Sequence, residues 1–276
     1  MKAVFAIALT EIRIGIRNSW VLLSAGILAV FSILLVLLGS GPSGAVDAHP
    51  LTVAVTSLST LAVYLIPLIA LLLSFDAVAG EVDRGTLQLV LATPIARWQV
   101  LFGKFIGHTA VLTIAIAAGY GIAGVLGYAL GGTDGFEPLA DLLSLVVTSV
   151  LLGAVFVAVG YLASCSVRQT GTAAALAVGI WLITVVLYDM ALLGGLLVSQ
   201  DGIFARTIFP WLLLLNPADA FRVYNMAAVD GSLLQTGLGT GASGLPLEGS
   251  GVLLSPILWC FAALRLAALA FRRITP

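Results

Sequence analysis

Apolar stretches of roughly 20 residues recur along this chain, and each is long enough to cross a bilayer as a helix. Of its 276 residues, 61% are apolar and only 9% are charged, whereas a soluble domain is typically about 25% charged. A membrane barrel would instead show shorter segments of alternating polarity. The sequence therefore predicts one all-α, multi-pass membrane domain over residues 1–276. Its six expected spans are 20–38, 51–75, 105–130, 139–164, 173–198 and 252–271.

The basic residues predict how these spans are oriented. Ten of the 12 Lys and Arg residues lie on one side of the predicted membrane, or at span ends that face it: Lys2, Arg13, Arg17, Arg84, Arg97, Lys104, Arg168, Arg265, Arg272 and Arg273. Only Arg206 and Arg222 lie on the other side. Because cytoplasmic loops carry the excess of Lys and Arg, both termini are expected in the cytoplasm. A net charge of −1 without a basic run gives no reason to expect a nucleic-acid partner.

Two segments outside the predicted spans have apolar character of their own. Residues 1–18 are amphipathic and predict a helix lying on the inner membrane surface. Residues 199–251 form the one long external segment, and its apolar part, 209–221, is too short and too broken to span. We interpret that part as a pair of re-entrant or interfacial helices before the last span.

A polar segment interrupts the apolar pattern between the second and third spans, at residues 76–104. Its charged side chains cannot lie in hydrocarbon, so it is expected at the membrane face, where it can meet a soluble partner. Four of its residues fall on one helical stripe, at i, i+3, i+4 and i+7: Leu87, Val90, Leu91 and Pro94. The pattern predicts a short amphipathic helix over 81–97, whose displacement would move both flanking spans.

The string EVDRGTLQLVLATPIARWQVLFGK resembles the coupling region of ABC transporter permeases of the exporter class, which handles polysaccharides, drugs and related cargo. The matching positions are Glu81, Arg84, Gly85, Thr86, Leu87, Pro94, Arg97, Gly103 and Lys104. That family also has an N-terminal amphipathic helix, six spans and re-entrant helices before the last span. The resemblance implies that residues 81–97 form a coupling helix for an ATPase, with Asp83 and Leu91 also in contact.

A longer resemblance narrows the expected function of the permease. It extends through the strings FDAVAGEVDRGTLQLVLATPIARWQ and LNPADAFRVYN. Both strings are similar to permeases that serve the maturation of the copper enzyme nitrous oxide reductase. The resemblance implies a bacterial inner-membrane location and a permease made of two copies of the chain. It also implies a cytoplasmic ATPase dimer, a periplasmic subunit, and an action that concerns copper or sulfur delivery.

The ATPase must be a separate chain, because this sequence has no phosphate-binding loop. The motif G-x-x-x-x-G-K-[ST] is absent: Trp98 stands five residues before Gly103, and Phe105 follows Lys104. No cofactor is therefore expected on this chain, and ATP and magnesium are expected on the partner.

Asp189 is the one carboxylate well inside an apolar stretch, and intramembrane charges are candidates for functional sites. At 1.5 Å per residue it lies about 24 Å from the cytoplasmic end of its span, near the outer interface. Its place within an apolar stretch favours a role in a path or gate, whereas its place near the outer interface favours the alternatives, a wetted helix end or a partner of an external Arg. Arg206, Asp219 and Arg222 are candidates for contact with an external partner, and a solvated lid is the alternative.

The sequence gives no support for an enzyme active site or for a resident metal site. G-x-S-x-G and H-E-x-x-H are absent, so no catalytic residue is expected. Soft ligands suit copper, but the three Met, two Cys and two His residues are scattered, so no metal ligands are expected either. Two functional alternatives stay open: export of another cargo, and a scaffold that passes mechanical work to a periplasmic partner without moving cargo.

Overall fold

The computed structural model describes residues 2–17, 19–39, 50–92, 94–131, 137–199, 202, 204–228, 247 and 249–274. All the described regular structure is helical, and none of these residues is in a strand. The α-helices are α1 (Lys2–Ile16), α2 (Ser19–Gly39), α3 (Pro50–Ser74), α4 (Ala79–Asp83), α5 (Leu87–Leu91), α6 (Arg97–Gly131), α7 (Glu137–Ser166), α8 (Thr170–Trp181), α9 (Tyr188–Ser199), α10 (Phe209–Leu215), α11 (Pro217–Ala228) and α12 (Leu254–Arg273). Two π-helices, Leu182–Leu187 and Phe204–Ile208, and a 3₁₀-helix, Gly249–Leu253, complete the described elements.

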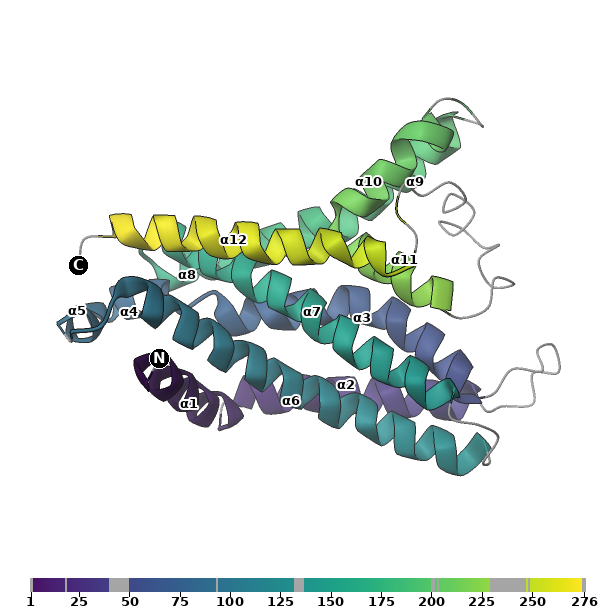
Figure 1. The fold of residues 1–276 in the computed structure, drawn as a ribbon, viewed down its shortest axis with the longest axis horizontal. Coiled ribbons are helices and arrows are strands. Elements are labelled where there is room, and N and C mark those ends of the chain that lie inside the picture. The colour runs from purple at the N-terminus through teal and green to yellow at the C-terminus, as the bar shows by residue number, and fades with distance from the viewer. Residues whose placement is uncertain are drawn as a thin grey trace.

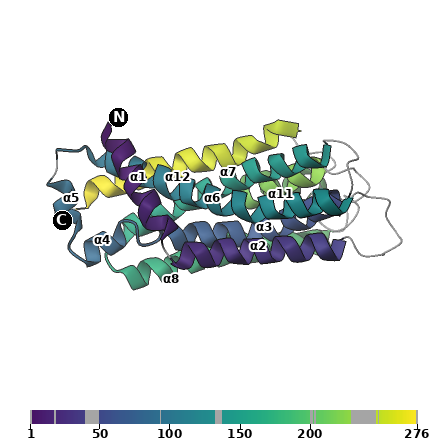
Figure 2. The ribbon, with the colours of Figure 1, turned by 90° about the horizontal axis from the view of Figure 1, so that it is seen from below.

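The long helices run side by side as a bundle, with α3 and α7 at its centre (Figure 1). Both ends of the chain lie at one end of this bundle, together with α4 and α5. Helix α1 crosses the bundle axis at that end and packs against α6 (Figure 2). At the opposite end α9 and α10 lean away from the bundle, while α11 returns to lie against it. The molecule therefore has two distinct ends, and the polar segment 76–104 lies at the one with both termini.

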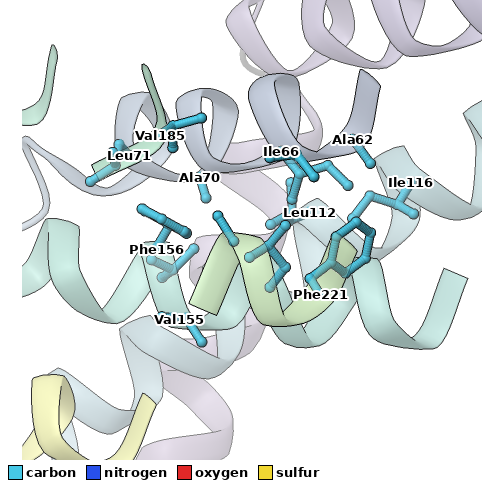
Figure 3. Packing of buried hydrophobic residues seen from close by; sticks show 14 of the residues in the cluster. Ala62, Ile66, Ala70, Leu71, Leu112, Ile116, Val155, Phe156, Val185 and Phe221 are labelled. Carbon is cyan, nitrogen blue, oxygen red and sulfur yellow. The ribbon is translucent and has the colours of Figure 1, made fainter. Parts of the chain in front are cut away.

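The core forms where α3 meets α6, α7 and α11 (Figure 3). Ala62, Ile66 and Ala70 recur every fourth residue on α3, so they share one face, and all three are fully buried. Phe156 of α7 and Phe221 of α11 fill the space against this face. Small and large side chains thus alternate across the contact, which lets the helices approach closely.

Five helical stretches are long and apolar enough to cross a membrane, and α1 with α2 could form a sixth, bent by 65°. The five are 55–83, 97–129, 139–166, 170–199 and 249–273. Each overlaps an expected span, so the all-helical membrane architecture is confirmed. Helix α2 corresponds to the expected first span, and α1 to the expected surface helix before it.

The structure divides segment 81–97, for which one short amphipathic helix is expected. That segment forms two helices of five residues each, α4 and α5. Gly85 adopts φ +69° between them, a left-handed conformation that only glycine adopts at little cost. The N–H groups of Gly85 and Thr86 donate to the carbonyls of Val82 and Glu81, which is the hydrogen-bond pattern of a glycine C-cap.

Candidate functional site

The polar segment is held to the bundle by a buried ionic cluster. Lys104 Nζ of α6 lies 2.7 Å from Glu11 Oε1 of α1 and 2.8 Å from Glu81 Oε1 of α4. All three side chains are at most 16% exposed. One ammonium group therefore joins three helices, and the two carboxylates depend on it for their neutralisation.

The cluster extends across α6 into α7. His108 lies one turn after Lys104, and its Nε2 is 3.5 Å from Glu11 Oε2. On the other side of the ring, Nδ1 is hydrogen-bonded to the hydroxyl of Tyr161 at 2.8 Å. Tyr161 is fully buried on α7. A continuous polar path thus runs from α4 through α6 to both α1 and α7.

Two glycines allow α1 to come close enough to α6 to join this cluster. A Cβ at Gly103 would lie 2.9 Å from Cβ of Ile7, and one at Gly107 would lie 2.5 Å from Cβ of Glu11. Real side chains do not pack that closely, so both positions require glycine for this helix pair. Because Gly103 and Gly107 are one turn apart, they present a flat face to α1.

Hydrogen bonds fasten α4 at both of its ends. The N–H groups of Val78 and Ala79 donate to Ser164 Oγ of α7, at 3.0 and 2.9 Å. At the other end Asp83 Oδ2 accepts from the hydroxyl of Thr170 at 2.9 Å and from its N–H at 3.3 Å. Asp83 thereby caps the start of α8, where four N–H groups lack helical partners.

Arg97 makes a similar attachment at the end of the polar segment. Its guanidinium Nη1 donates to the carbonyls of Phe271, Arg272 and Ile274, at 3.1, 3.1 and 2.8 Å. The first two oxygens belong to the last turn of α12, whose carbonyls carry partial negative charge, and Ile274 follows that turn directly. The first residue of α6 is thus bound to the end of the last helix.

The remaining candidates divide between the interior and the surface. Leu87 is buried in the main core and Leu91 packs against it, whereas Arg84, Gly85, Thr86 and Pro94 are exposed. Leu89 is 72% exposed, although it is apolar and lies at the tip of the molecule. The segment therefore has an inward face that is bonded to four helices, α6, α7, α8 and α12, and an outward face that makes no such bond among the described residues.

Asp189 belongs to a second buried cluster at the opposite end. Its two oxygens each accept a hydrogen bond at 2.9 Å from Arg222 of α11, and Tyr64 of α3 donates to the same carboxylate at 3.2 Å. Asp189 therefore pairs with Arg222, one of the two arginines expected on the external side, and its role in a path or gate stays a prediction. The cluster lies beside the π-helix Leu182–Leu187, which interrupts the regular helix between α8 and α9.

Asp219 also faces Arg222, with 3.5 Å between Oδ1 and Nη1, and it accepts from the Asn216 amide at 2.8 Å. Burial raises the pKa of Asp219 to about 7, opposed by the positive charge of Arg222 and supported by the negative charge of Asp189. The Arg222 guanidinium thus pairs with two carboxylates, and it lies closer to Asp189 than to Asp219. Of the three external candidates, Asp219 and Arg222 face each other inside the fold, and the side chain of Arg206 lies outside the described residues.

Sequence reasoning missed Glu11, His108 and Tyr161 as members of the site. Glu11 is the only acidic residue in the expected surface helix, and an acid on an otherwise basic amphipathic helix is the signal that could have found it. Among the described residues, no group of three His, Cys, Asp or Glu side chains converges as metal ligands would.

Comparison with known proteins identifies the family to which this geometry belongs. The model of the ABC-2 family transporter protein matches residues 5–274. The chain belongs to the ABC-2 transporter family. The permease is 37% identical over 274 residues to the probable ABC transporter permease protein NosY of Stutzerimonas stutzeri, covering 99% of both chains. It is 39% identical over 274 residues to the protein of the same name from Pseudomonas aeruginosa, again covering 99% of both chains.

Proposed function

We propose that this permease subunit receives mechanical work from a separate ATPase at the outward face of segment 81–97. The observation that carries the proposal is the Lys104 cluster, which joins that segment to α1 and α6 through two buried ion pairs. A rigid connection is needed at such a point, because a flexible loop would absorb a displacement rather than pass it on.

The outward and inward faces of segment 81–97 have different roles in this proposal. Arg84, Thr86 and Pro94 are exposed and form the contact with the ATPase, together with Leu89. Glu81, Asp83 and Arg97 are bonded inward to α6, α8 and α12, and they transmit the displacement. Binding and transmission are therefore separable by mutation.

The partners and cargo follow from the likeness to NosY. The permease would act as two copies in the bacterial inner membrane, with a cytoplasmic ATPase dimer of the NosF type and a periplasmic subunit of the NosD type. ATP and magnesium would bind the ATPase, and this chain would hold no cofactor of its own. The work would support delivery of copper or sulfur during the maturation of nitrous oxide reductase, with both termini in the cytoplasm.

Arg84→Glu tests the contact half of this proposal. The exposed position predicts normal membrane insertion and an unchanged melting temperature, with at least a severalfold loss of co-purifying ATPase. Lys2→Glu, which reverses an exposed charge on α1, is the matched control and should retain the ATPase. An ATPase that stays bound to Arg84→Glu at the normal ratio would show that it docks elsewhere.

Glu81→Ala tests the transmission half. This variant should keep the ATPase bound but lower the response of ATP hydrolysis to the permease, because Glu81 faces Lys104 and not the surface. Loss of ATPase binding in this variant, or a full response of the bound ATPase, would contradict the division of roles.

The same purified complex separates transport from pure mechanical transmission. ATP hydrolysis would be measured with copper ions, with a sulfur compound and with the periplasmic subunit, alongside uptake into vesicles. Uptake would support the transport of cargo, whereas stimulation by the periplasmic subunit without uptake would favour a mechanotransmitting scaffold. Export of another cargo would show as stimulation by neither copper nor sulfur.

A further inference from the structure

A groove of about 450 Å³ lies between α7 and α12, at the end of the bundle that holds both termini. Its volume falls in the range of about 300–1,000 Å³ that is usual for ligand pockets. Val82 of α4 closes it on the side of the polar segment. None of the residues in the Lys104 cluster lines it, so it is a separate feature of the molecule.

The groove combines apolar walls with a basic mouth. Leu162, Leu266 and Leu269 line its walls, and the two last are each 52% exposed. Arg168 follows the end of α7 and Arg273 ends α12, and both are exposed in the lining. Within the described part of the chain, neither arginine has an acidic partner within 4.0 Å, and no lining residue is acidic.

The order of these residues along the membrane normal matches the order of groups in a lipid. Leu266 precedes Arg273 by seven residues, so it lies about 10 Å deeper along the axis of α12. Both helices are candidate spans that end here, which places the arginines at headgroup level and the leucines at acyl-chain level. Basic pockets between spans on the cytoplasmic side are suited to anionic headgroups.

We propose that this groove binds one anionic phospholipid, with its phosphate between Arg168 and Arg273 and an acyl chain against Leu162, Leu266 and Leu269. The positive charges of Arg168 and Arg273 and the apolar walls of the groove together favour an anionic phospholipid. A zwitterionic lipid also carries a phosphate, but its own ammonium group cancels that charge, so it would bring no net negative charge to the two arginines. Free phosphate would leave the exposed leucines uncovered. The bound lipid would also touch Val82, and so reach the segment that the ATPase is proposed to move.

The proposal is tested on the full-length chain in nanodiscs of phosphatidylcholine with increasing phosphatidylglycerol, by native mass spectrometry of retained lipid. We expect one tightly retained phosphatidylglycerol, and a loss of retention of about fivefold for each of Arg168→Gln and Arg273→Gln. Arg272→Gln removes an exposed charge beside the groove that is not in its lining, and it should retain the lipid.

Two further measurements separate the groove from general attraction to charge. Ala270→Phe fills the apolar part while keeping both arginines, and it should also displace phosphatidylglycerol. Inorganic phosphate should compete weakly, because it lacks the acyl chain.

Equal retention of phosphatidylglycerol in Arg168→Gln, Arg273→Gln and Arg272→Gln, or full displacement of the lipid by inorganic phosphate, would overturn the proposal. If Arg168→Gln and Arg273→Gln retain the lipid but no longer co-purify with the ATPase, the groove would be assigned to the ATPase instead. These lipid measurements need no ATPase, so their outcome is independent of the proposed coupling.

Discussion

Lys104 stabilises two carboxylates at once, and this makes it the residue on which the site depends most. Its ammonium is nearly buried and lies within 2.8 Å of both Glu11 and Glu81. A buried charge that loses its partner costs far more than the same charge in water. Removing Lys104 therefore leaves two like charges close together with little solvent.

Lys104→Met is expected to lower the free energy of unfolding by about 3–5 kcal/mol. The measurement is the thermal melting temperature of the purified protein in detergent. The triple variant Lys104→Met, Glu11→Gln and Glu81→Gln removes the stranded charges and should recover much of the loss. Equal melting temperatures for Lys104→Met and the exposed control Lys2→Met would contradict the buried cluster.

Asp219 predicts a dependence of stability on pH at the other end of the molecule. Burial raises its pKa from 3.8 to about 7, so the folded state holds the proton more tightly than the unfolded state does. Its contribution to stability is therefore complete below pH 3.8 and is lost as the pH rises through about 7. The melting temperature of the parent protein should fall as the pH rises between these limits, and Asp219→Asn should reduce that fall. If the melting temperature of Asp219→Asn falls as steeply with pH as that of the parent protein, the dependence belongs to other groups.

At the scale of the element, α1 is held by shape as well as by charge. Gly103 and Gly107 let its backbone approach α6, and only at that distance does Glu11 reach Lys104. The Gly-x-x-x-Gly spacing is visible in the sequence, but the helix that it would contact is not. Pairing depends on which surfaces meet in the folded chain, and Glu11 and Lys104 are separated by 93 residues.

Gly107→Leu should push α1 away from α6 and destabilise the protein by about 1–3 kcal/mol, as overpacking of a tight contact does. Gly121→Leu is the matched control, because Gly121 lies on the same helix and a Cβ at that position would meet no atom within 4 Å. Hydrogen exchange should rise in residues 2–16 of Gly107→Leu and stay unchanged in the control. The same exchange in both variants would show that α1 does not rest on this face.

The division of the expected helix over 81–97 falls at a position that the sequence marks. Gly85 follows Arg84 at the position where a glycine ends a helix. The apolar stripe from Leu87 to Pro94 begins after this glycine, so it agrees with α5 and carries no information about residues 81–86. At the end of α4, Asp83 contacts Thr170 of α8, which is 87 residues away and which no local pattern encodes.

At the scale of the whole molecule, long apolar runs were the reliable guide. Runs of this length can be satisfied only by helices in a bilayer, because every backbone group needs a partner there. Helical rise predicts Asp189 near the outer end of its span, and that placement stays a prediction. Its bidentate contact with Arg222, 33 residues later, depends on how α11 folds back onto the bundle, and no local pattern encodes that return.

Both termini at one end of the bundle lead to a prediction about orientation in the membrane. Fusions of green fluorescent protein to either terminus should fluoresce, while fusions of alkaline phosphatase there should be inactive, because both ends are expected in the cytoplasm. A phosphatase inserted after Ala228 should instead be active, since α11 lies toward the opposite end. Active phosphatase at either terminus would reverse the proposed orientation.

The attachment of Arg97 to the end of α12 has a mechanical consequence. A helix that is pushed near a free terminus loses much of the motion to fraying of its last turn. Here the first residue of α6 donates two hydrogen bonds to the last turn of α12 and a third to the carbonyl of Ile274 just beyond it. In the proposed coupling, a load on the polar segment would therefore reach α6 and α12 together, in parallel rather than in series along the chain.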